Sequence, residues 1–282
     1  MKYKYQVSAN ITIPNPKART IIADLYRTAA KGAPLVIFCH GYKGFKDWGA
    51  WSLVAENFAA SGFDFLKFNF SLNGGTLEQP IDFPDEEAFA QNTYSQELKD
   101  VETVICWAQE RLQPTKIALV GHSRGGGIAL LAAAQNEAVS AIATWAAVSD
   151  FETRFPTGEA LAHWKKTGKR EIINQRTQQV LIHNYSFYTD FFEHKNRLDL
   201  PKWVAQLKKP LLIVHGKRDD AVALSHAEQL HRWAPQSEQL LIAHATHTFN
   251  SRHPWGKPYL PKPLQEAVDH TKLFFKKSIS LA

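Results

Sequence analysis

Cysteine is scarce in this sequence. Its 282 residues include only two cysteines, Cys39 and Cys106. They do not form a Cys-x-x-Cys pair, and their number and spacing do not indicate a disulfide framework. Cys39 lies in an apolar run and Cys106 in a helical pattern, so we expect both to be buried thiols.

Long apolar runs are also missing. No stretch of about eighteen consecutive apolar residues occurs, so the sequence predicts no membrane-spanning helix. The residues from Met1 to Gln6 lack the apolar centre of a secretory signal peptide. From these absences we expect a soluble cytoplasmic protein with no membrane partner.

A strong excess of one charge is absent as well. The 33 basic and 27 acidic residues give a formal net charge of +6, and the basic residues are spread along the chain. The densest basic group, at 165–166 and 169–170, is typical of a solvated loop rather than of a phosphate-binding patch. We therefore expect no nucleic-acid partner. The hydrophobic fraction of 44% and the aromatic fraction of 12% are those of a globular protein with a sizeable core.

Strand and helix patterns alternate along most of the chain. Segments 5–13 and 20–26 partly alternate apolar and polar residues, which predicts an antiparallel pair or a meander. Segment 34–39 is a continuous apolar run that ends at His40-Gly41, as expected for a strand buried on both faces. Further strands are predicted at 63–70, 116–120, 138–146, 210–215 and 239–243, and helices at 51–60, 95–112, 124–134, 225–233 and 264–276. This order predicts an α/β fold with a mostly parallel central sheet and helices on both faces.

Two segments depart from this alternation. Segment 71–92 is long and polar, so we predict a loop that lines a functional site. Segment 151–209 is rich in aromatic and basic residues, and we predict a short helical insertion there. The chain then consists of a core at 1–150 and 210–282 and a cap insertion at 151–209. The aromatic residues of the insertion are Phe151, Phe155, Trp164, Tyr185, Phe187, Tyr188, Phe191, Phe192 and Trp203.

The motif Gly121-His122-Ser123-Arg124-Gly125 stands between a predicted buried strand and a predicted helix of small residues. A Gly-x-Ser-x-Gly motif alone is common by chance, but a nucleophilic serine needs this strand–turn–helix setting. The two outer glycines lack the Cβ atoms that would clash where strand and helix approach each other. We predict that Ser123 is a nucleophile. The alternative is a glycine-rich turn whose serine has no chemical role.

Together with three other segments, this motif resembles the α/β-hydrolases, and among them most the dienelactone-hydrolase-like and feruloyl-esterase-like serine hydrolases. The other segments are His40-Gly41-Tyr42-Lys43-Gly44, the stretch from His215 to Val222, and His247-Thr248-Phe249. The resemblance covers most of the chain and is weakest in the insertion. It implies the α/β-hydrolase fold, a catalytic triad in the chain order serine, acid, histidine, and an oxyanion hole of backbone amides.

The resemblance places the other two triad members late in the chain. The acid falls on Asp219, after the predicted strand at 210–215. The adjacent Asp220 remains the alternative, because spacing alone does not rank two neighbouring carboxylates. The general base falls on His247, although Thr246 stands where the family more often has glycine. Asp219 would orient His247, which would take the serine proton and return it to the leaving group.

The oxyanion hole is implied at two backbone amides. One belongs to Arg124, directly after the nucleophile, and the other to Tyr42, in the loop after the strand at 34–39. The alternative for this loop is a plain strand-to-loop turn. We expect no cofactor, since serine, imidazole and amides supply the nucleophile, the proton transfer and the charge stabilisation.

Histidines near the triad segments could suggest a metal site. His244 and His247 are three residues apart, and His215 is nearby in sequence. No His-Glu-x-x-His or similar pattern accompanies them, so we predict no metal. We expect His244 to be a strand-end residue without a chemical role and His122 to pack beneath the turn that carries Ser123.

These predictions favour a carboxylesterase-like serine hydrolase that forms an acyl-enzyme on Ser123, with a small-molecule ester as its partner. We expect the aromatic insertion to cap Ser123 and to favour an apolar or aromatic acyl group. The first alternative is a peptidase or amidase on the same triad, for which Asp190 and Glu193 could bind a substrate amine. The second is a catalytically silent binding protein on this fold. Its weakness is that all three triad positions can be filled.

Overall fold

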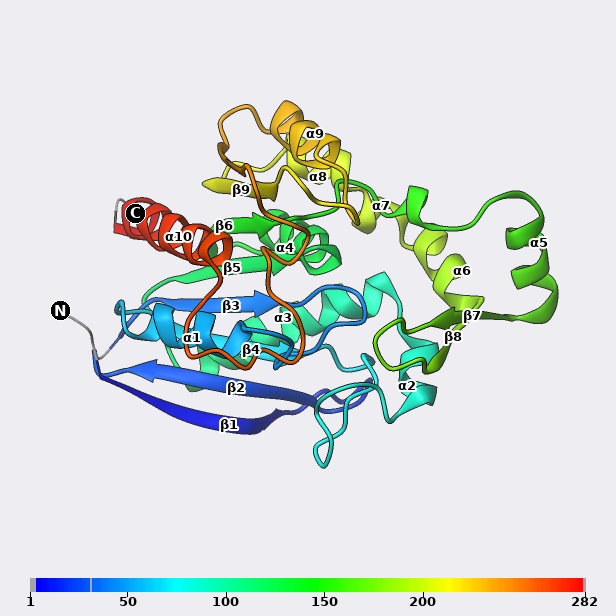
Figure 1. Cartoon of the computed structure of the whole chain (residues 1–282), viewed down its shortest axis with the longest axis horizontal. Helices are drawn as coiled ribbons and strands as arrows, with labels where there is room; N and C mark the ends of the chain where they lie inside the picture. Colours follow the sequence, from blue (N-terminus) through cyan, green and yellow to red (C-terminus); the bar gives the residue numbers. More distant parts are fainter. Residues whose placement is uncertain (1–3, 31, 281–282) are drawn as a thin grey trace.

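An eight-stranded sheet runs through the centre of the computed structural model, which describes residues 4–30 and 32–280 (Figure 1). Its strands are β1 (Tyr5–Ile13), β2 (Ile21–Thr28), β3 (Leu35–Cys39), β4 (Asp64–Asn69), β5 (Ile117–His122), β6 (Val139–Trp145), β9 (Leu211–Gly216) and β10 (Glu238–Ile242). They are arranged in the order β1-β2-β4-β3-β5-β6-β9-β10. β2 is antiparallel to both of its neighbours, and the strands from β4 to β10 are parallel. The predicted antiparallel pair and mostly parallel sheet are therefore confirmed.

Helices cover both faces of this sheet (Figure 1). The helices are α1 (Trp51–Ala59), α2 (Glu86–Gln91), α3 (Tyr94–Arg111), α4 (Arg124–Gln135), α5 (Gly158–Thr167), α6 (Ser186–Glu193), α7 (Lys195–Leu198), α8 (Leu200–Ala205), α9 (Ser225–Trp233) and α10 (Lys262–Ser280). α1 and α10 pack on one face, and α3, α4, α8 and α9 pack on the other. None of the helices within the described residues combines the length and the apolar character that a bilayer crossing requires.

The central strands are buried on both faces. In β3, Leu35 and Ile37 belong to one hydrophobic core, and Val36 and Phe38 belong to the other. Successive side chains of a strand point to opposite faces of the sheet, so a strand covered on both sides needs apolar residues at every position. This requirement explains the continuous apolar run at 34–39.

The long helix α3 follows from a cap and a helical period. The side chain of Thr93 accepts a hydrogen bond from the amide three residues later, and Leu98 and Ile105 lie on the buried stripe. Cys106 follows Ile105 around the helix and is exposed. The predicted burial is therefore confirmed for Cys39 and wrong for Cys106, because one step along a helix turns a side chain by about 100° away from the core.

The polar segment 71–92 does not line the cavities beside Ser123 that are described below. It contains α2, which packs against β8 of the insertion. Phe83 and Phe89 form a small buried cluster with Phe45 and Leu181. The prediction of a site-lining loop is therefore wrong, because the apolar residues within this segment bury it against the insertion.

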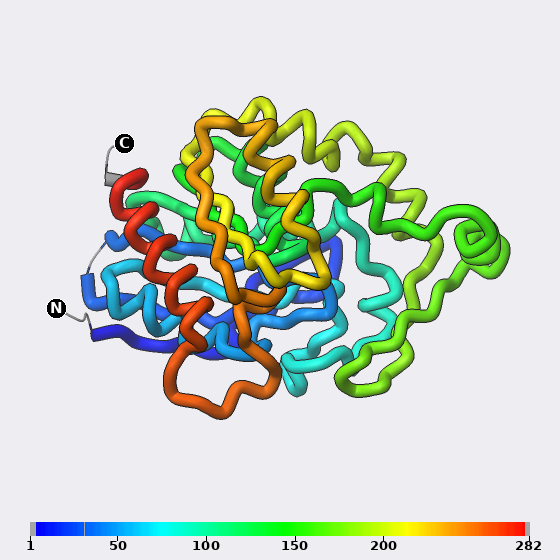
Figure 2. The backbone as a smooth tube through the Cα atoms, turned by 45° about the horizontal axis from the view of Figure 1, so that its top comes forward, coloured from blue at the N-terminus to red at the C-terminus, as the bar shows by residue number. Residues whose placement is uncertain are grey.

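The segment between β6 and β9 contains strands as well as the predicted helices. β7 (Lys169–Ile173) and β8 (Val180–Asn184) form a separate antiparallel pair. In Figure 1, α5, β7, β8 and α6 lie on the side of the sheet toward which β3 points, and Figure 2 places the start of β1 and the end of α10 on the opposite side. α8 packs against α4 and α9 and so contributes to a helix layer of the sheet.

Candidate active site

Ser123 lies on a sharp turn between β5 and α4. Its backbone has φ 56° and ψ −121°, a conformation that non-glycine residues rarely adopt. A Cβ atom on Gly121 would collide with the backbone of Gly125 and lie 2.6 Å from the Cα of Gly126. A Cβ on Gly125 would collide with the backbone of Cys39 and His40 at the end of β3. Close packing of α4 against β5 and β3 therefore requires glycine on both sides of the serine, as the motif predicts.

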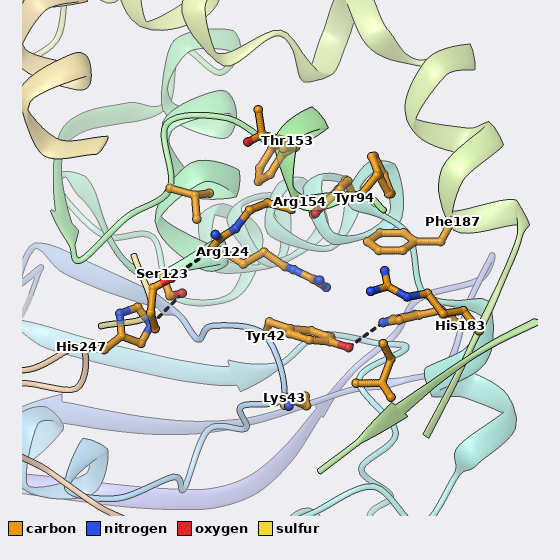
Figure 3. Close-up of a pocket in the computed structure, with 16 residues that line it drawn as sticks. Tyr42, Lys43, Tyr94, Ser123, Arg124, Thr153, Arg154, His183, Phe187 and His247 are labelled. Carbon is orange, nitrogen blue, oxygen red and sulfur yellow. Dashed lines mark hydrogen bonds between the residues drawn. The ribbon is translucent and has the colours of Figure 1, made fainter. Parts of the chain in front are cut away.

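The structure brings Ser123, His247 and Asp219 together. Nε2 of His247 is 3.0 Å from the Ser123 hydroxyl oxygen, a contact drawn in Figure 3. Nδ1 of the same ring is 2.8 Å from Oδ2 of Asp219, whose side chain is fully buried. The other carboxylate oxygen of Asp219 accepts two backbone amides, at 2.9 and 2.8 Å. Asp220 is exposed, and it is Asp219 that contacts the histidine.

The charge on Asp219 determines which ring nitrogen of His247 carries a proton. Burial acts to raise the pKa of the Asp219 carboxyl, but hydrogen bonds from His215, His247 and a backbone amide hold it well below its usual range. The carboxylate is therefore ionised at neutral pH and accepts a hydrogen bond from Nδ1 of His247. Nε2 then presents its lone pair to the hydroxyl of Ser123, as a general base requires.

Two buried histidines support this arrangement from behind. Nε2 of His122 donates to the backbone carbonyl of His247 at 2.9 Å, and burial lowers the pKa of His122 to about 3. Nε2 of His215 donates to a backbone carbonyl at 2.9 Å and lies 3.3 Å from Asp219. His122 therefore packs beneath the turn as predicted, and His215 has a supporting contact that the sequence did not reveal. His244 is exposed, and the described residues contain no cluster of three histidine, cysteine or acidic side chains suited to a metal ion.

The loop after β3 lies directly against the nucleophile. A Cβ on Gly41 would stand 3.0 Å from the Cβ of Ser123, so this backbone approaches the turn very closely. Arg124 is the first residue of α4, and the amides in the first turn of a helix have no partner within the helix. Tyr42 and Arg124 both line the cavity at Ser123. The use of their amides as an oxyanion hole remains a prediction.

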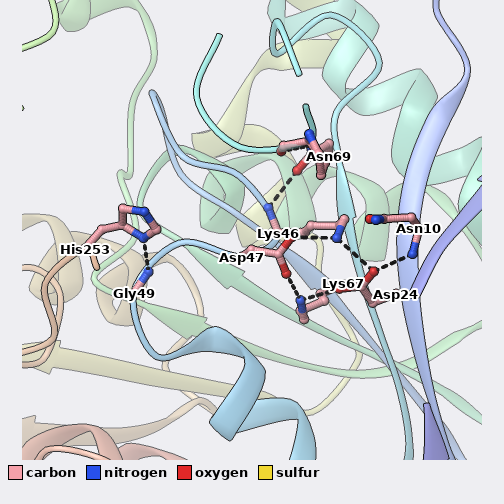
Figure 4. Close-up of polar contacts among 9 residues, drawn as sticks. Asn10, Asp24, Lys46, Asp47, Gly49, Lys67, Asn69 and His253 are labelled. Atoms are coloured by element: carbon pink, nitrogen blue, oxygen red, sulfur yellow. Dashed lines mark hydrogen bonds and ion pairs between the residues drawn. The ribbon is translucent and has the colours of Figure 1, made fainter. Parts of the chain in front are cut away.

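A buried ion network fixes the same loop to the sheet (Figure 4). Nζ of Lys46 is 2.8 Å from Oδ1 of Asp24 in β2 and 2.6 Å from Oδ2 of Asp47, and Lys67 in β4 pairs with both carboxylates. Burial opposes the charge on Asp24, but the two lysines lower its pKa to about 2. Lys67 stands within the apolar run at 63–70. A lysine there signals a buried acidic partner, and the sequence-based prediction did not use this signal.

Two cavities meet at Ser123. The larger has a volume of about 490 Å³ and the smaller about 280 Å³. Tyr42, Lys43, Ser123 and His247 line both of them. The larger cavity extends under the insertion, and its aromatic lining consists of Tyr42, Tyr94, Phe151, Phe155 and Phe187. The smaller cavity is lined on its far side by Trp48, Trp51, Asn174, Gln175 and Arg176.

The side chain of Arg124 crosses the larger cavity (Figure 3). Its guanidinium lies 4.0 Å from the ring centroid of Tyr42, 5.0 Å from that of Tyr94 and 5.2 Å from that of Phe187. Nη1 is 3.3 Å from Oε1 of the buried Glu97. The sequence-based prediction assigned only the amide of Arg124, because the distant partners of its side chain leave no local pattern.

The two acidic residues proposed to bind a substrate amine do not line either cavity. Asp190 accepts a hydrogen bond of 2.5 Å from the hydroxyl of Ser95 and so connects α6 to the start of α3. Glu193 is exposed. That prediction is therefore wrong, because the acid of Asp190 serves packing between helices.

Three comparisons with known proteins concern the fold of this chain. A family model described as "alpha/beta hydrolase fold" matches residues 34–168. The quorum-quenching protein AidA of Acinetobacter baumannii is 28% identical over 123 residues, which are 43% of this chain, and the match spans only 38% of AidA.

Solved structures resemble nearly the whole chain. Est1E from Butyrivibrio proteoclasticus, with ferulic acid bound, has a TM-score of 0.70 at 19% identity and covers 96% of this chain and 99% of its own. The dienelactone hydrolase from Anabaena variabilis has a TM-score of 0.65 at 16% identity and covers 97% of this chain and 98% of its own. With its parallel sheet and its serine turn between β5 and α4, the chain is related to the α/β-hydrolase superfamily and has the α/β-hydrolase fold.

Proposed function

We propose that this protein is a serine hydrolase that cleaves a carboxylic ester through an acyl-enzyme on Ser123. The observation that carries the proposal is the continuous hydrogen-bonded line from Ser123 through His247 to the buried Asp219, at 3.0 and 2.8 Å. Such a line activates a hydroxyl that is otherwise a weak nucleophile at neutral pH.

Each residue of the site has its own role in the proposed reaction. Nε2 of His247 takes the proton of Ser123 as its oxygen attacks the ester carbonyl carbon. The oxyanion of the tetrahedral intermediate accepts hydrogen bonds from the amides of Tyr42 and Arg124. When the intermediate collapses, the imidazolium returns the proton to the departing alkoxide, and an acyl-enzyme remains. His247 then activates a water molecule in the same way, which releases the acid and restores the serine.

The hydrogen bond between His247 and Asp219 supports each of these steps. It holds the imidazole with its proton on Nδ1 and stabilises the imidazolium that forms when Nε2 takes the serine proton. The names of the structural relatives also favour an ester, since Est1E has ferulic acid bound and another relative is a dienelactone hydrolase. The aromatic lining of the larger cavity favours an apolar or aromatic part of the substrate.

Labelling and hydrolysis with one pair of variants test the proposal. Wild-type protein should react with a fluorophosphonate at Ser123, identified by peptide mapping, and should hydrolyse 4-nitrophenyl butyrate. Ser123→Ala should lose both activities and keep its circular dichroism spectrum. Ser225→Ala, which changes an exposed serine at the start of α9, should keep both. Labelling at another residue, or near-normal hydrolysis by Ser123→Ala, would refute the proposal.

A further inference from the structure

The charged side chains that line the larger cavity at Ser123 are all positive. Its charged side chains are Lys43, Arg124, Arg154 and Arg170, and no aspartate or glutamate is among its described lining residues. The four cations come from the loop after β3, the start of α4, the segment after β6, and β7. Four separate parts of the chain therefore converge on this one space with the same sign of charge.

Within the part of the chain that the structure describes, only one of these four cations forms a salt bridge to an acid. Arg124 pairs with Glu97 at 3.3 Å and packs against three aromatic rings. Burial acts to lower the pKa of Arg124, but the neighbouring Glu97 carboxylate outweighs it. The guanidinium stays charged, and it forms a neutralised, rigid part of the cavity wall.

The other three cations are held by neutral groups. Nη2 of Arg154 donates to the carbonyl of Ala221 at 3.1 Å, and Nζ of Lys43 donates to the carbonyl of Ile173 at 3.4 Å. The guanidinium of Arg170 lies 5.7 Å from the ring centroid of Trp164. Within residues 4–30 and 32–280, none of the three forms a salt bridge to a carboxylate. They are positioned, yet their charges are uncompensated.

Neighbouring titratable groups respond to this positive field. Burial lowers the pKa of His183 to about 3, and the nearby Arg124, Arg170 and Lys43 add to the effect. Burial and Arg124 also lower the pKa of Lys43. His183 is therefore neutral and adds no charge, and it lies 2.8 Å from the hydroxyl of Tyr42.

We propose that this cavity selects an ester that carries a carboxylate, bound by Arg154, Arg170 and Lys43 while its apolar or aromatic body packs on the phenylalanines of the insertion. The inference rests on the proposed function and adds the substrate class to it. A carboxylate would form charge-assisted hydrogen bonds with these donors and balance their charges. A neutral ester of the same shape would gain none of these bonds. Because Arg154 is exposed and Lys43 and Arg170 are half-buried, water still solvates their charges, and we expect a several-fold rather than an absolute preference for the anionic ester.

Two pairs of esters that differ in one charge test this proposal. The first pair is the mono-4-nitrophenyl ester of adipic acid and the same ester with its free carboxylate methylated. The second is 3-carboxy-4-nitrophenyl butyrate and 4-nitrophenyl butyrate, which places the carboxylate on the leaving group instead. We expect kcat/KM of the anionic ester to exceed that of its neutral partner at least fivefold in one of the pairs, chiefly through a lower KM.

Substitution of the cations identifies the cause of the preference. In Arg154→Gln and in Arg170→Gln the anionic-to-neutral ratio of kcat/KM should fall at least threefold. Because both esters meet the same variant, any general disturbance of the site cancels from the ratio. Arg232→Gln, which removes the same charge from an exposed position on α9, should keep the wild-type ratio. A ratio below fivefold in both pairs, or one that is unchanged in both cavity variants, overturns the proposal.

Different experimental results would refute the proposed ester hydrolase and the proposed carboxylate site. If the neutral esters are hydrolysed through Ser123 without a preference for the anionic ones, the ester hydrolase stands and the carboxylate site does not. If no ester is hydrolysed and Ser123 is not labelled, the proposed function fails. Calorimetry with Ser123→Ala then still decides the carboxylate site, since the adipate monoester should bind at least fivefold tighter than its methylated partner.

Discussion

Replacement of Asp219 by asparagine should abolish most of the activity without removing a single heavy-atom contact. Oδ1 of Asp219 accepts the amides of Ala221 and Val222 at 2.9 and 2.8 Å, so the oxygen of the new side chain is held at that position. Its NH₂ group then takes the place of Oδ2, 2.8 Å from Nδ1 of His247. The reverse orientation would set the NH₂ against two N–H donors.

The substitution changes which ring nitrogen of His247 carries the proton. An NH₂ donor requires Nδ1 to accept, which moves the imidazole proton to Nε2, the nitrogen that is 3.0 Å from the Ser123 hydroxyl. In that tautomer the histidine has no lone pair for the serine proton. The same change in other serine triads lowers kcat roughly 10⁴-fold, which corresponds to about 5 kcal/mol of activation free energy.

The assay is steady-state hydrolysis of 4-nitrophenyl butyrate together with the rate of fluorophosphonate labelling. Asp220→Asn is the matched control, since it makes the same chemical change at the adjacent, exposed position, and its kcat should stay within about twofold of wild type, as for most surface substitutions. If Asp219→Asn keeps more than a tenth of the wild-type kcat, or if Asp220→Asn loses as much, the assignment of the acid is wrong.

Two further predictions concern the framework of the site. Gly121→Ala should lose activity and melt at a lower temperature, because its Cβ would collide with the backbone of Gly125. Gly256→Ala is the control and should change little, because its Cβ would meet nothing within 4 Å. Equal melting temperatures of the two variants would contradict this reasoning. The pKa of Asp24 is lowered to about 2 in the folded protein, compared with about 4 in the unfolded chain. The ionised carboxylate therefore stabilises the fold above about pH 4, and this stabilisation is lost as the pH falls from about 4 toward 2. Between pH 5 and 2, urea titrations should therefore show that wild type loses roughly 2 kcal/mol more stability than Asp24→Asn, which is already destabilised at pH 5. Parallel curves for the two proteins would refute this reasoning.

Much of the fold was readable from local patterns. The strand at 34–39 and the helix at 225–233 follow from apolar runs and helical periods, and the structure has β3 and α9 at these positions. The serine turn was equally readable, because its glycines form a recognisable motif, although the clash that excludes a Cβ at Gly125 is with Cys39 and His40, far away in the sequence. Asp219 and His247 were located through the order of segments in a resembling family.

Other features carry no local pattern. The strands β7 and β8 lie in a segment for which the sequence predicts a helical insertion, and their strand conformation depends on the pairing of one with the other. The exposure of Cys106 depends on which helix face the sheet covers. The segment 71–92 was assigned to the site by its length, but its burial depends on the insertion that covers it.

The sequence by itself determined the order of strands and helices and the turn that carries Ser123, because both arise from spacing along the chain. Tertiary structure alone decided the surroundings of that serine: the Asp24 network beneath the loop, the pairing of Arg124 with Glu97, and a cavity lined by cations from four elements. The physical reason is the distance along the sequence between the residues that interact. A glycine turn or an apolar period can be recognised from residues a few positions apart, whereas the charge of a cavity is the sum of side chains that meet only after the chain has folded.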